Sequence, residues 1–142
     1  MSAYTEVQTQ IKDQEALLEA LQSVNNRLGR NWTLEDIEVH ETPQPLFDYM
    51  GKRRPQVANV IIRRDKVGGA ANDIGFERAQ DGTFRVHVSE YDSTWYGEKW
   101  QQEVNVEYGT KFVERAAKKN GYRMKKEVQA DGSVKLSLSR WR

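Results

Sequence analysis

The chain opens with a strand pattern followed by a helix pattern. Between residues 3 and 11, side chains that are apolar or threonine alternate with other, mostly polar ones. A period of two is typical of a strand with one buried face. Asp13 comes next, and its carboxylate can accept a hydrogen bond from the first free N–H groups of a helix. Leucines then recur at helical spacing until Gly29, which favours the left-handed conformation that ends helices. We therefore predict a strand and then a helix over residues 14–28.

The next part of the chain predicts two strands separated by a turn. Residues 33–40 place Ile37 and Val39 on one face of a short strand. Residues 42–45 contain two prolines, which lack a backbone donor, so we expect an extended turn there. Residues 57–64 are rich in valine and isoleucine and predict a buried strand. Residues 67–72, which contain two glycines, predict a loop.

Two later segments each predict a hairpin built around Asp-Gly. The first pair of strands is joined at Asp81-Gly82 and the second at Asp131-Gly132, with alternating apolar residues on both sides of each turn. Asp-Gly is a strong hairpin signal because glycine tolerates the positive φ that matches the twist of the strands. The similarity of the two hairpins is consistent with a duplication or with a recurring local solution, and we favour the second.

Between the hairpins, a helix is predicted over residues 98–120, ending at Gly121. Trp100, Val104, Tyr108 and Phe112 form one apolar ridge along it. The predicted element order is β-α-β-β-β-β-α-β-β. This order is typical of an α+β fold. We expect a single α+β domain over residues 1–142, in which two helices pack on one face of a mostly antiparallel sheet and cover a single β-layer.

Composition narrows the class of protein. The 142 residues include four Trp, six Tyr and four Phe, which is typical of a folded domain and not of a disordered chain. The absence of cysteine excludes disulfides, thiolate nucleophiles and zinc–thiolate sites. No apolar run approaches the ~20 residues of a membrane span, and the first residues lack a signal-peptide pattern. We expect a soluble protein without a membrane span, located in the cytoplasm or the plastid stroma.

Charge is distributed unevenly along the chain. Residues 1–51 hold nine acids and three bases, whereas residues 118–142 hold two acids and eight bases. This gradient either presents a basic face to an anionic partner or pairs the two ends of the chain with each other. We favour the second interpretation.

Histidine and carboxylate residues offer weak candidates for a metal site. His40 is followed by Glu41, and His87 precedes Glu90 and Asp92, and these are ligand types that zinc or non-haem iron accepts. His87, however, alternates with two valines and is expected to point to the sheet face opposite the core. We therefore predict an exposed or helix-covered strand residue and expect no metal and no cofactor.

The sequence gives little support for catalysis. It contains no nucleophile-elbow, zincin or Walker-type motif. The pair Gly68-Gly69 lacks the following Lys-Ser or Lys-Thr of a phosphate-binding loop. A small enzyme would require Asp73, His87 and Asp92 to share one pocket with separated pKa values. We predict that the protein is not an enzyme.

Basic and aromatic clusters are better candidates for binding. Basic residues gather at 52–54, at 63–66 and after the second helix, and they would suit a nucleic acid, although a solvated charged face is the simpler interpretation. Three aromatic residues lie within residues 91–96, where they either seat the second helix on the sheet or form a partner surface.

Several of these motifs together resemble a known family. They are the opening Tyr4–Ile11, the segment Asn72–Phe76, the aromatic segment ending at Trp100, and the closing stretch from Asp131 to Trp141. The chain resembles the hypothetical chloroplast reading frame thirty-five family over nearly its whole length. That family is a domain of unknown function found in cyanobacteria, plastids and some other bacteria. The resemblance implies an accessory role beside a small companion protein and an AAA+ ATPase.

We conclude from the sequence that the function is unknown. The leading hypothesis is a non-catalytic accessory or adapter protein that acts through protein–protein contacts, with an AAA+ ATPase or a small companion protein as its partner. The alternative hypothesis is a nucleic-acid-binding module that uses the basic clusters. The candidate partner-binding residues are Tyr91, Trp95, Tyr96, Arg63, Arg64, Arg140 and Trp141.

Overall fold

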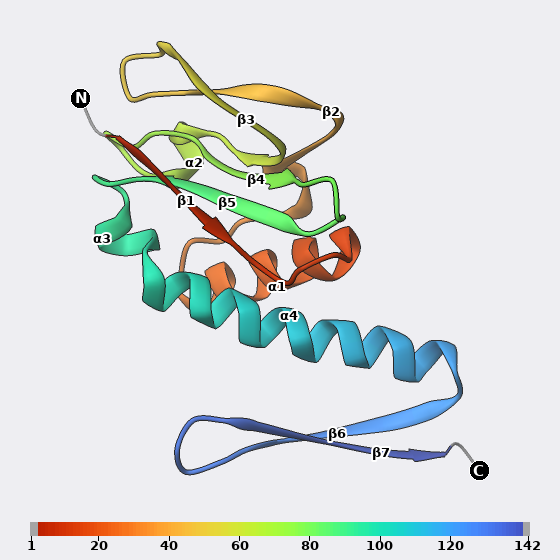
Figure 1. Ribbon diagram of the computed structural model, residues 1–142. Coiled ribbons are helices and arrows are strands. Elements are labelled where there is room, and N and C mark those ends of the chain that lie inside the picture. Colours follow the sequence, from red (N-terminus) through yellow and green to blue (C-terminus); the bar gives the residue numbers. More distant parts are fainter. Residues whose placement is uncertain (1–2, 141–142) are drawn as a thin grey trace.

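The computed structural model describes residues 3–140, and its largest part is a five-stranded sheet (Figure 1). Every neighbouring pair of strands is antiparallel, and the order across the sheet is β1-β5-β4-β3-β2. The strands are β1 (Tyr4–Gln8), β2 (Ile37–Phe47), β3 (Arg53–Ile62), β4 (Ile74–Arg78) and β5 (Phe84–Ser89). The predicted α+β class and the predicted order of strands and long helices are confirmed.

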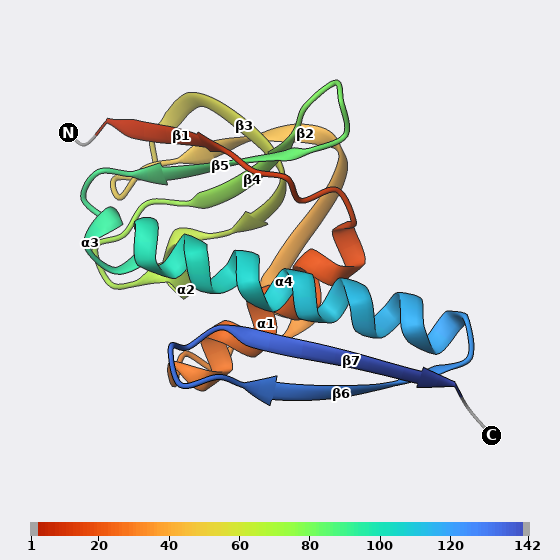
Figure 2. The same ribbon diagram turned by 60° about the horizontal axis from the view of Figure 1, so that its bottom comes forward.

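Two long helices, α1 (Gln14–Arg27) and α4 (Glu98–Lys119), lie along one face of this sheet, as predicted (Figure 2). α1 begins where the Asp13 carboxylate accepts a hydrogen bond from the Ala16 N–H at 3.0 Å. Burial of apolar side chains between the helices and the strands holds these layers together. The core contains Leu17, Leu21, Val24, Val60, Ile62, Phe76, Val86, Trp100 and Val104.

Strand β2 runs through the segment where a turn is expected. It continues through Pro43 and Pro45 to Phe47, and its pairing with β3 shifts register between Val39 and Gln44. The prediction of a turn over residues 42–45 is therefore wrong. The physical reason is that β2 is an edge strand, where a proline can replace an N–H that no neighbouring strand needs.

The last residues of β2, from Gln44 to Phe47, pair with the first residues of β3, from Arg53 to Ala58. These paired segments bend over the face of the sheet that the helices leave open. Leu46, Ala58 and Ile61 form a second, smaller core there with Tyr4, although β1 and β2 are opposite edges of the sheet. Gly75 permits this approach, because a Cβ at that position would lie 2.5 Å from the Ala58 Cβ. This bend covers the middle of the sheet on its second face.

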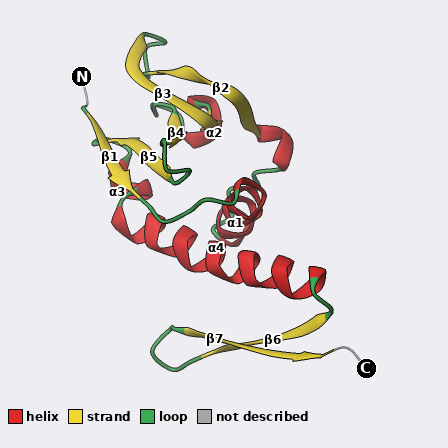
Figure 3. Cartoon of the chain, turned by 45° about the vertical axis from the view of Figure 1, so that its right-hand side comes forward, coloured by secondary structure: helices red, strands yellow, loops and turns green. Residues whose placement is uncertain are grey.

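The last two strands form a separate sheet. β6 (Tyr122–Val128) and β7 (Val134–Arg140) pair only with each other, and they lie on the opposite side of α4 from the five-stranded sheet (Figure 3). The expectation of a single β-layer is wrong for this hairpin. Its half-buried residues, such as Met124 and Leu136, share the face that also carries Lys126, whose Nζ lies 4.0 Å from Glu107 Oε1 on α4. The assignment of residues 1–142 to one domain stays a prediction.

Three short helices complete the described part of the chain. They are η1 (Leu34–Asp36), α2 (Arg64–Val67) and α3 (Ser93–Tyr96). α2 and α3 contribute residues to the pockets described next. Among the helices of residues 3–140, none has both the length and the apolar character needed to cross a membrane.

Candidate functional site

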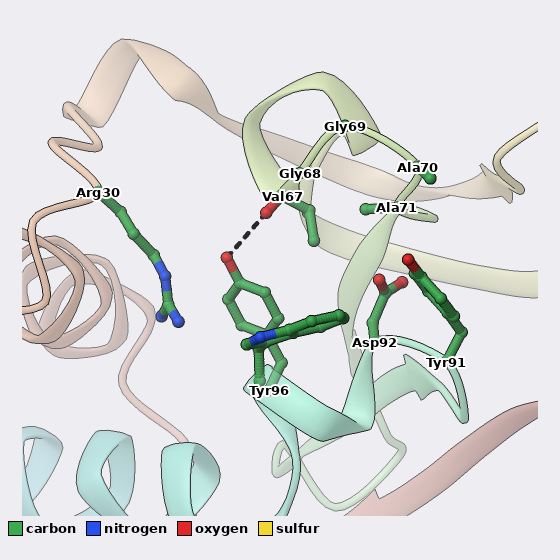
Figure 4. Close-up of a pocket in the computed structure, with 10 residues that line it drawn as sticks. Arg30, Val67, Gly68, Gly69, Ala70, Ala71, Tyr91, Asp92 and Tyr96 are labelled. Atoms are coloured by element: carbon green, nitrogen blue, oxygen red, sulfur yellow. Dashed lines mark hydrogen bonds between the residues drawn. The ribbon is translucent and has the colours of Figure 1, made fainter.

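Two pockets lie on either side of one loop between α2 and β4. We call residues 68–71, Gly-Gly-Ala-Ala, the 68–71 loop. The first pocket measures about 260 Å³ and lies between this loop and the segment Tyr91–Tyr96 (Figure 4). The second measures about 630 Å³ and lies between the same loop and residues 63–65. The fold thus brings the predicted aromatic segment and the predicted basic edge to the same place.

The aromatic segment is held in place by the buried carboxylate of Asp92. Asp92 Oδ2 accepts hydrogen bonds from the Asn72 backbone N–H at 2.9 Å, from Asn72 Nδ2 at 3.1 Å and from Ser89 Oγ at 2.8 Å. Asn72 Oδ1 accepts the Tyr49 N–H at 2.8 Å. A buried carboxylate requires several such donors to offset its lost hydration. This network fixes the start of α3 relative to the end of the 68–71 loop.

The three aromatic residues of this segment have different environments. Tyr96 is buried, donates its hydroxyl to the Val67 carbonyl at 3.0 Å and stacks on Trp32 with a 6.0 Å separation between ring centroids. Burial raises the pKa of the Tyr96 hydroxyl. Tyr91 and Trp95, in contrast, are 47% and 53% exposed and contact each other edge to face at 5.7 Å. Tyr96 therefore seats the segment on the core, and the other two rings face solvent.

Arg30 closes the far side of the first pocket. Its guanidinium lies 4.3 Å from the centre of the Tyr96 ring and donates to Asn25 Oδ1 at 2.9 Å. Figure 4 shows this side chain pointing toward Tyr96 from outside the segment Tyr91–Tyr96. Within residues 3–140, Arg30 forms no ion pair with a carboxylate. Its charge is thus balanced only by neutral dipoles and a ring face.

The two arginines of the predicted basic edge, Arg63 and Arg64, differ in whether carboxylates pair with their charge. Arg63 donates to both oxygens of Glu38, each at 2.9 Å, and to Asp73 Oδ2 at 2.9 Å. Burial opposes the charged form of Arg63, but the bonds to these two carboxylates outweigh it and raise its pKa. Arg64 is exposed, and its Nη1 donates to the Tyr49 carbonyl at 2.7 Å. The guanidinium of Arg63 is therefore paired inside the fold, whereas the guanidinium of Arg64 lies at the surface without a carboxylate partner in the described part of the chain.

Asp73 is the centre of the second buried network, on the other side of the loop. Asp73 Oδ2 also accepts the Phe47 N–H at 2.7 Å, and its Oδ1 accepts the Arg64 N–H at 2.7 Å. The Asp73 carbonyl accepts the hydroxyl of Tyr4 at 2.6 Å. Burial, aided by the charge of Asp73, raises the pKa of Tyr4. The segment Asn72–Asp73, which carries part of the family resemblance, is thus the polar support of both pockets.

Comparison with known proteins identifies the family. A family model described as "Protein of unknown function (DUF1257)" matches residues 33–137. The chain belongs to this DUF1257 family. It is 24% identical over 144 residues to "Uncharacterized protein ycf35" of Cyanophora paradoxa, an alignment that covers 100% of this chain and 99% of the relative. It is 23% identical over 145 residues to the protein of the same name from Pyropia yezoensis, with 99% and 98% covered. The predicted resemblance to the plastid reading frame family is confirmed. No solved structure matches the chain.

The matched DUF1257 region contains the 68–71 loop and the segment Tyr91–Tyr96, whereas Arg30 precedes it. The remaining predicted contact residues lie elsewhere. Arg140 is on β7, opposite Tyr122 in the ladder and with its guanidinium 5.2 Å from that ring. Tyr122 lies just after the C-terminal end of α4, whereas α3 and the first pocket lie just before its N-terminal end. The 22 residues of α4 therefore separate Arg140 from the pockets. Trp141 lies outside the described residues.

The hypothesis of a catalytic centre around Asp73, His87 and Asp92 requires these groups to share a pocket, and the structure does not bring them together. Asp92 lines the first pocket and Asp73 the second. His87 points to the face opposite the helices, as expected, and its Nε2 lies 2.8 Å from Glu77 Oε1. The same histidine is 3% exposed although it faces away from the helices, so the prediction of an exposed or helix-covered strand residue is wrong.

One set of ligand atoms with metal-binding spacing is present among residues 3–140. It consists of Glu6, Glu77 and His87, whose ligand atoms lie within 4.8 Å of one another. In the sequence, the carboxylates that suggest themselves as metal ligands beside His87 are its close neighbours Glu90 and Asp92. Glu6 and Glu77 could not be predicted as its neighbours, because the register of the strands, not sequence spacing, brings them to His87.

Sequence reasoning also misses Arg30 and treats the 68–71 loop as a simple connection. No local pattern marks Arg30, because its partner ring on Tyr96 is distant in the sequence. The two glycines of the loop are the only available signal, and they indicate a turn without saying what surrounds it.

Proposed function

We propose that this DUF1257 protein is a non-catalytic accessory or adapter module that binds a partner protein at the 68–71 loop. The observation that carries the proposal is the exposed pair Tyr91 and Trp95, packed edge to face beside a pocket. Single exposed aromatic residues are common on protein surfaces. A supported aromatic pair next to a hollow is typical of the anchors that carry most of the affinity in protein interfaces.

The charges around the loop indicate the chemistry of the partner. Arg30 lies at the first pocket and Arg64 at the second, and neither pairs with a carboxylate in the described part of the chain. A partner segment that inserts an apolar side chain beside Trp95 and places carboxylates near the two guanidinium groups would complement this surface. An acidic peptide segment with an apolar anchor is therefore the partner that we propose.

The identity of the partner is proposed from the family resemblance. That resemblance associates these proteins with an AAA+ ATPase and a small companion protein, and both are the first binding candidates to test. We place the interaction in the cytoplasm or the plastid stroma. The plastid reading frame family supports this placement, since its relatives named ycf35 from Cyanophora paradoxa and Pyropia yezoensis align with nearly the whole chain.

The test is a binding measurement with a matched surface control. The purified chain would be titrated against the ATPase and the companion protein, with Trp95→Ala as the test variant and Phe112→Ala as the control. Phe112 is 46% exposed on α4 and lines neither of the two pockets. We expect Trp95→Ala to weaken binding at least tenfold, as for an interface anchor, and Phe112→Ala to leave it unchanged.

A second arm of the test uses extracts of the source cells. Proteins that co-purify with the wild-type chain would be compared by mass spectrometry with those retained by each variant. A partner retained by Phe112→Ala and lost by both Trp95→Ala and Arg64→Glu supports the proposal. Equal loss in all variants, or no partner above background, would overturn it.

A second candidate function rests on the β6–β7 hairpin. Lys125 and Lys135 lie on the exposed face that also carries Arg123, together with one acidic residue, Glu127, whose Oε1 lies 4.0 Å from Lys125 Nζ. A two-stranded basic ribbon can lie against a nucleic-acid backbone. If it does, affinity for RNA or DNA should fall steeply with salt.

The two functions are distinguishable with one pair of variants. The variant Lys125→Glu/Lys135→Glu should remove nucleic-acid binding in a fluorescence anisotropy titration. Lys99→Glu, an exposed lysine at the start of α4, should not. Binding that is undetectable, or that does not change with salt, would remove the nucleic-acid hypothesis and leave the partner hypothesis unaffected.

A further inference from the structure

A second chemical centre lies on the sheet face away from α1 and α4. Glu6 on β1 is directly opposite His87 on β5, and Glu77 on β4 lies two residues after Gly75, the partner of His87 on its other side. Side chains two residues apart in a strand point to the same face. The register of three adjacent strands therefore gathers these groups on one face, with their ligand atoms within 4.8 Å of one another.

Burial of His87 follows from its neighbours on this face. Gly75 has no side chain, and the bent ends of β2 and β3 come down on it, with Leu46 Cδ2 3.0 Å from where its Cβ would be. His87 is 3% exposed as a result, while Glu77 is half-buried and Glu6 is exposed. The imidazole is thus buried, whereas the Glu6 carboxylate beside it is open to solvent.

Of the two ring nitrogens of His87, Nε2 has a hydrogen-bond partner and Nδ1 has none in the described part of the chain. Nε2 lies 2.8 Å from Glu77 Oε1, and a carboxylate at that distance accepts the Nε2–H and leaves a lone pair on Nδ1. Nδ1 is buried and has no hydrogen-bond partner in the described part of the chain. Glu6 Oε1, which is itself an acceptor, lies 4.0 Å from Nδ1. A cation placed between these two acceptors would be bound by both.

The distances fit a divalent metal better than direct contact. Zinc binds imidazole nitrogen and carboxylate oxygen at ~2.0–2.2 Å, so a 4.0 Å gap between the two ligand atoms must close only slightly around the ion. The Glu6 side chain is 52% exposed and can make this movement. Its Oε2 lies 3.8 Å from Arg85 Nη1, which keeps the carboxylate near the site and leaves Oε1 free to turn inward.

We propose that Glu6 and His87 bind a zinc ion at this edge of the sheet, with Glu77 orienting the imidazole through Nε2. Water completes the coordination on the exposed side. A carboxylate that holds the second nitrogen of a metal-binding histidine is the usual arrangement around zinc. The ion would link β1, an edge strand of five residues, to β5 and through Glu77 to β4. This proposal replaces the expectation of no metal, and it is independent of the proposed partner surface.

The alternative occupant is a proton. A protonated His87 would donate Nε2–H to Glu77 and Nδ1–H toward Glu6 without any metal. Calcium and magnesium are poor alternatives, because both prefer sites made of oxygen ligands. Titration with zinc alone distinguishes a metal site from a protonated histidine.

The chain offers a matched control for this titration. It has no cysteine and only two histidines, and His40 also lies beside a carboxylate, with its Nε2 2.8 Å from Glu38 Oε1. The full chain, first treated with EDTA and then freed of it, would be titrated with ZnCl₂ by calorimetry. We expect one zinc ion per chain for the wild type and for His40→Gln, and none for His87→Gln.

Two milder variants keep the test valid if His87→Gln fails to fold. Glu6→Gln changes an exposed side chain and should weaken zinc binding at least tenfold. Glu77→Gln removes the orienting carboxylate and should weaken it by about ten- to a hundredfold. Cobalt titration gives a second measure, because the absorption of bound cobalt should appear in the wild type and decrease in Glu6→Gln. The proposal is overturned if the wild type binds no zinc, or if binding is lost in His40→Gln and retained in Glu6→Gln.

Discussion

The β4–β5 and β6–β7 hairpins have the same turn but different surroundings. In each, the glycine adopts a positive φ, +86° for Gly82 and +87° for Gly132. The glycine N–H donates to the carbonyl three residues earlier at 3.0 Å in both hairpins. The carboxylates of Asp81 and Asp131 each accept the N–H and the hydroxyl of the second residue after them. The local chemistry of the two turns is therefore equivalent.

The strands beside these turns decide what each hairpin becomes. β4 and β5 occupy the middle of the five-stranded sheet, and nearly all their residues are buried or half-buried. β6 and β7, by contrast, have no fully buried residue, most of their residues are exposed, and Val128 is 69% exposed. A turn sequence specifies where a chain reverses, whereas the apolar surface of the flanking strands specifies what the hairpin packs against. The following predictions test this difference.

The largest difference is expected from removal of an apolar side chain in each hairpin. Phe76 in β4 is 2% exposed and Leu138 in β7 is 51% exposed. Phe76→Ala should lower the free energy of unfolding by about 3–5 kcal/mol, because it leaves a cavity in the core. Leu138→Ala should lower it by less than about 1 kcal/mol. Urea titration followed by tryptophan fluorescence measures both. Similar losses for the two variants would contradict the comparison.

A smaller difference is expected from strain in the two turns. Gly82→Ala and Gly132→Ala both force an L side chain into a positive φ, which costs about 1–2 kcal/mol at either site. In β4–β5 this cost should appear in the unfolding of the whole sheet. In β6–β7 it should appear as faster amide exchange of that hairpin alone, with the global unfolding midpoint unchanged.

Hydrogen exchange measured by NMR, together with urea titration, separates these two results. Both glycine variants are made in a Trp95→Phe/Trp141→Phe background, so that fluorescence reports only on Trp32 and Trp100, which are buried in the main core. An equal shift of the midpoint in both glycine variants would mean that the two hairpins unfold as one unit.

The smallest expected effect is the response of the turns to acid. Hydrogen bonds from Thr83 lower the pKa of Asp81, and hydrogen bonds from Ser133 lower the pKa of Asp131, both below the usual 3.8. A carboxylate whose pKa is lowered by folding stabilises the turn above its unfolded-state pKa, and this stabilisation is lost as the pH falls through the folded-state pKa. Both turns should therefore weaken only below pH 3.8.

Carboxyl resonances followed by NMR from neutral to acidic pH check this prediction. Thr83→Val and Ser133→Ala should each return the pKa of the adjacent aspartate toward its usual value. Because the strands of β4–β5 are buried and those of β6–β7 are not, acid should perturb the amide resonances of β6–β7 first. Loss of both hairpins at the same pH would contradict this order.

The sequence predicts those features that depend on neighbouring residues. The helix cap at Asp13, both Asp-Gly turns, the two long helices and the strand order along the chain all follow from local hydrogen bonding and periodicity. The aromatic segment Tyr91–Tyr96 is also found in this way, because clustered aromatic residues are visible in one dimension. Which of its rings is buried is not visible, since Tyr96 depends on Trp32 and Val67 from other parts of the chain.

The tertiary structure alone decides the features that depend on register and on bending of the sheet. β2 continues through two prolines because that strand is at an edge of the sheet. The β6–β7 hairpin packs its one apolar face against α4, on the side of the helix away from the five-stranded sheet. The tertiary structure also brings Arg30 to Tyr96, and it brings Glu6 and Glu77 to His87. Periodicity shows which face of an element is apolar. Contacts between distant residues depend instead on which strands pair and on the register of each pair. The pattern of a single sequence does not specify either of these.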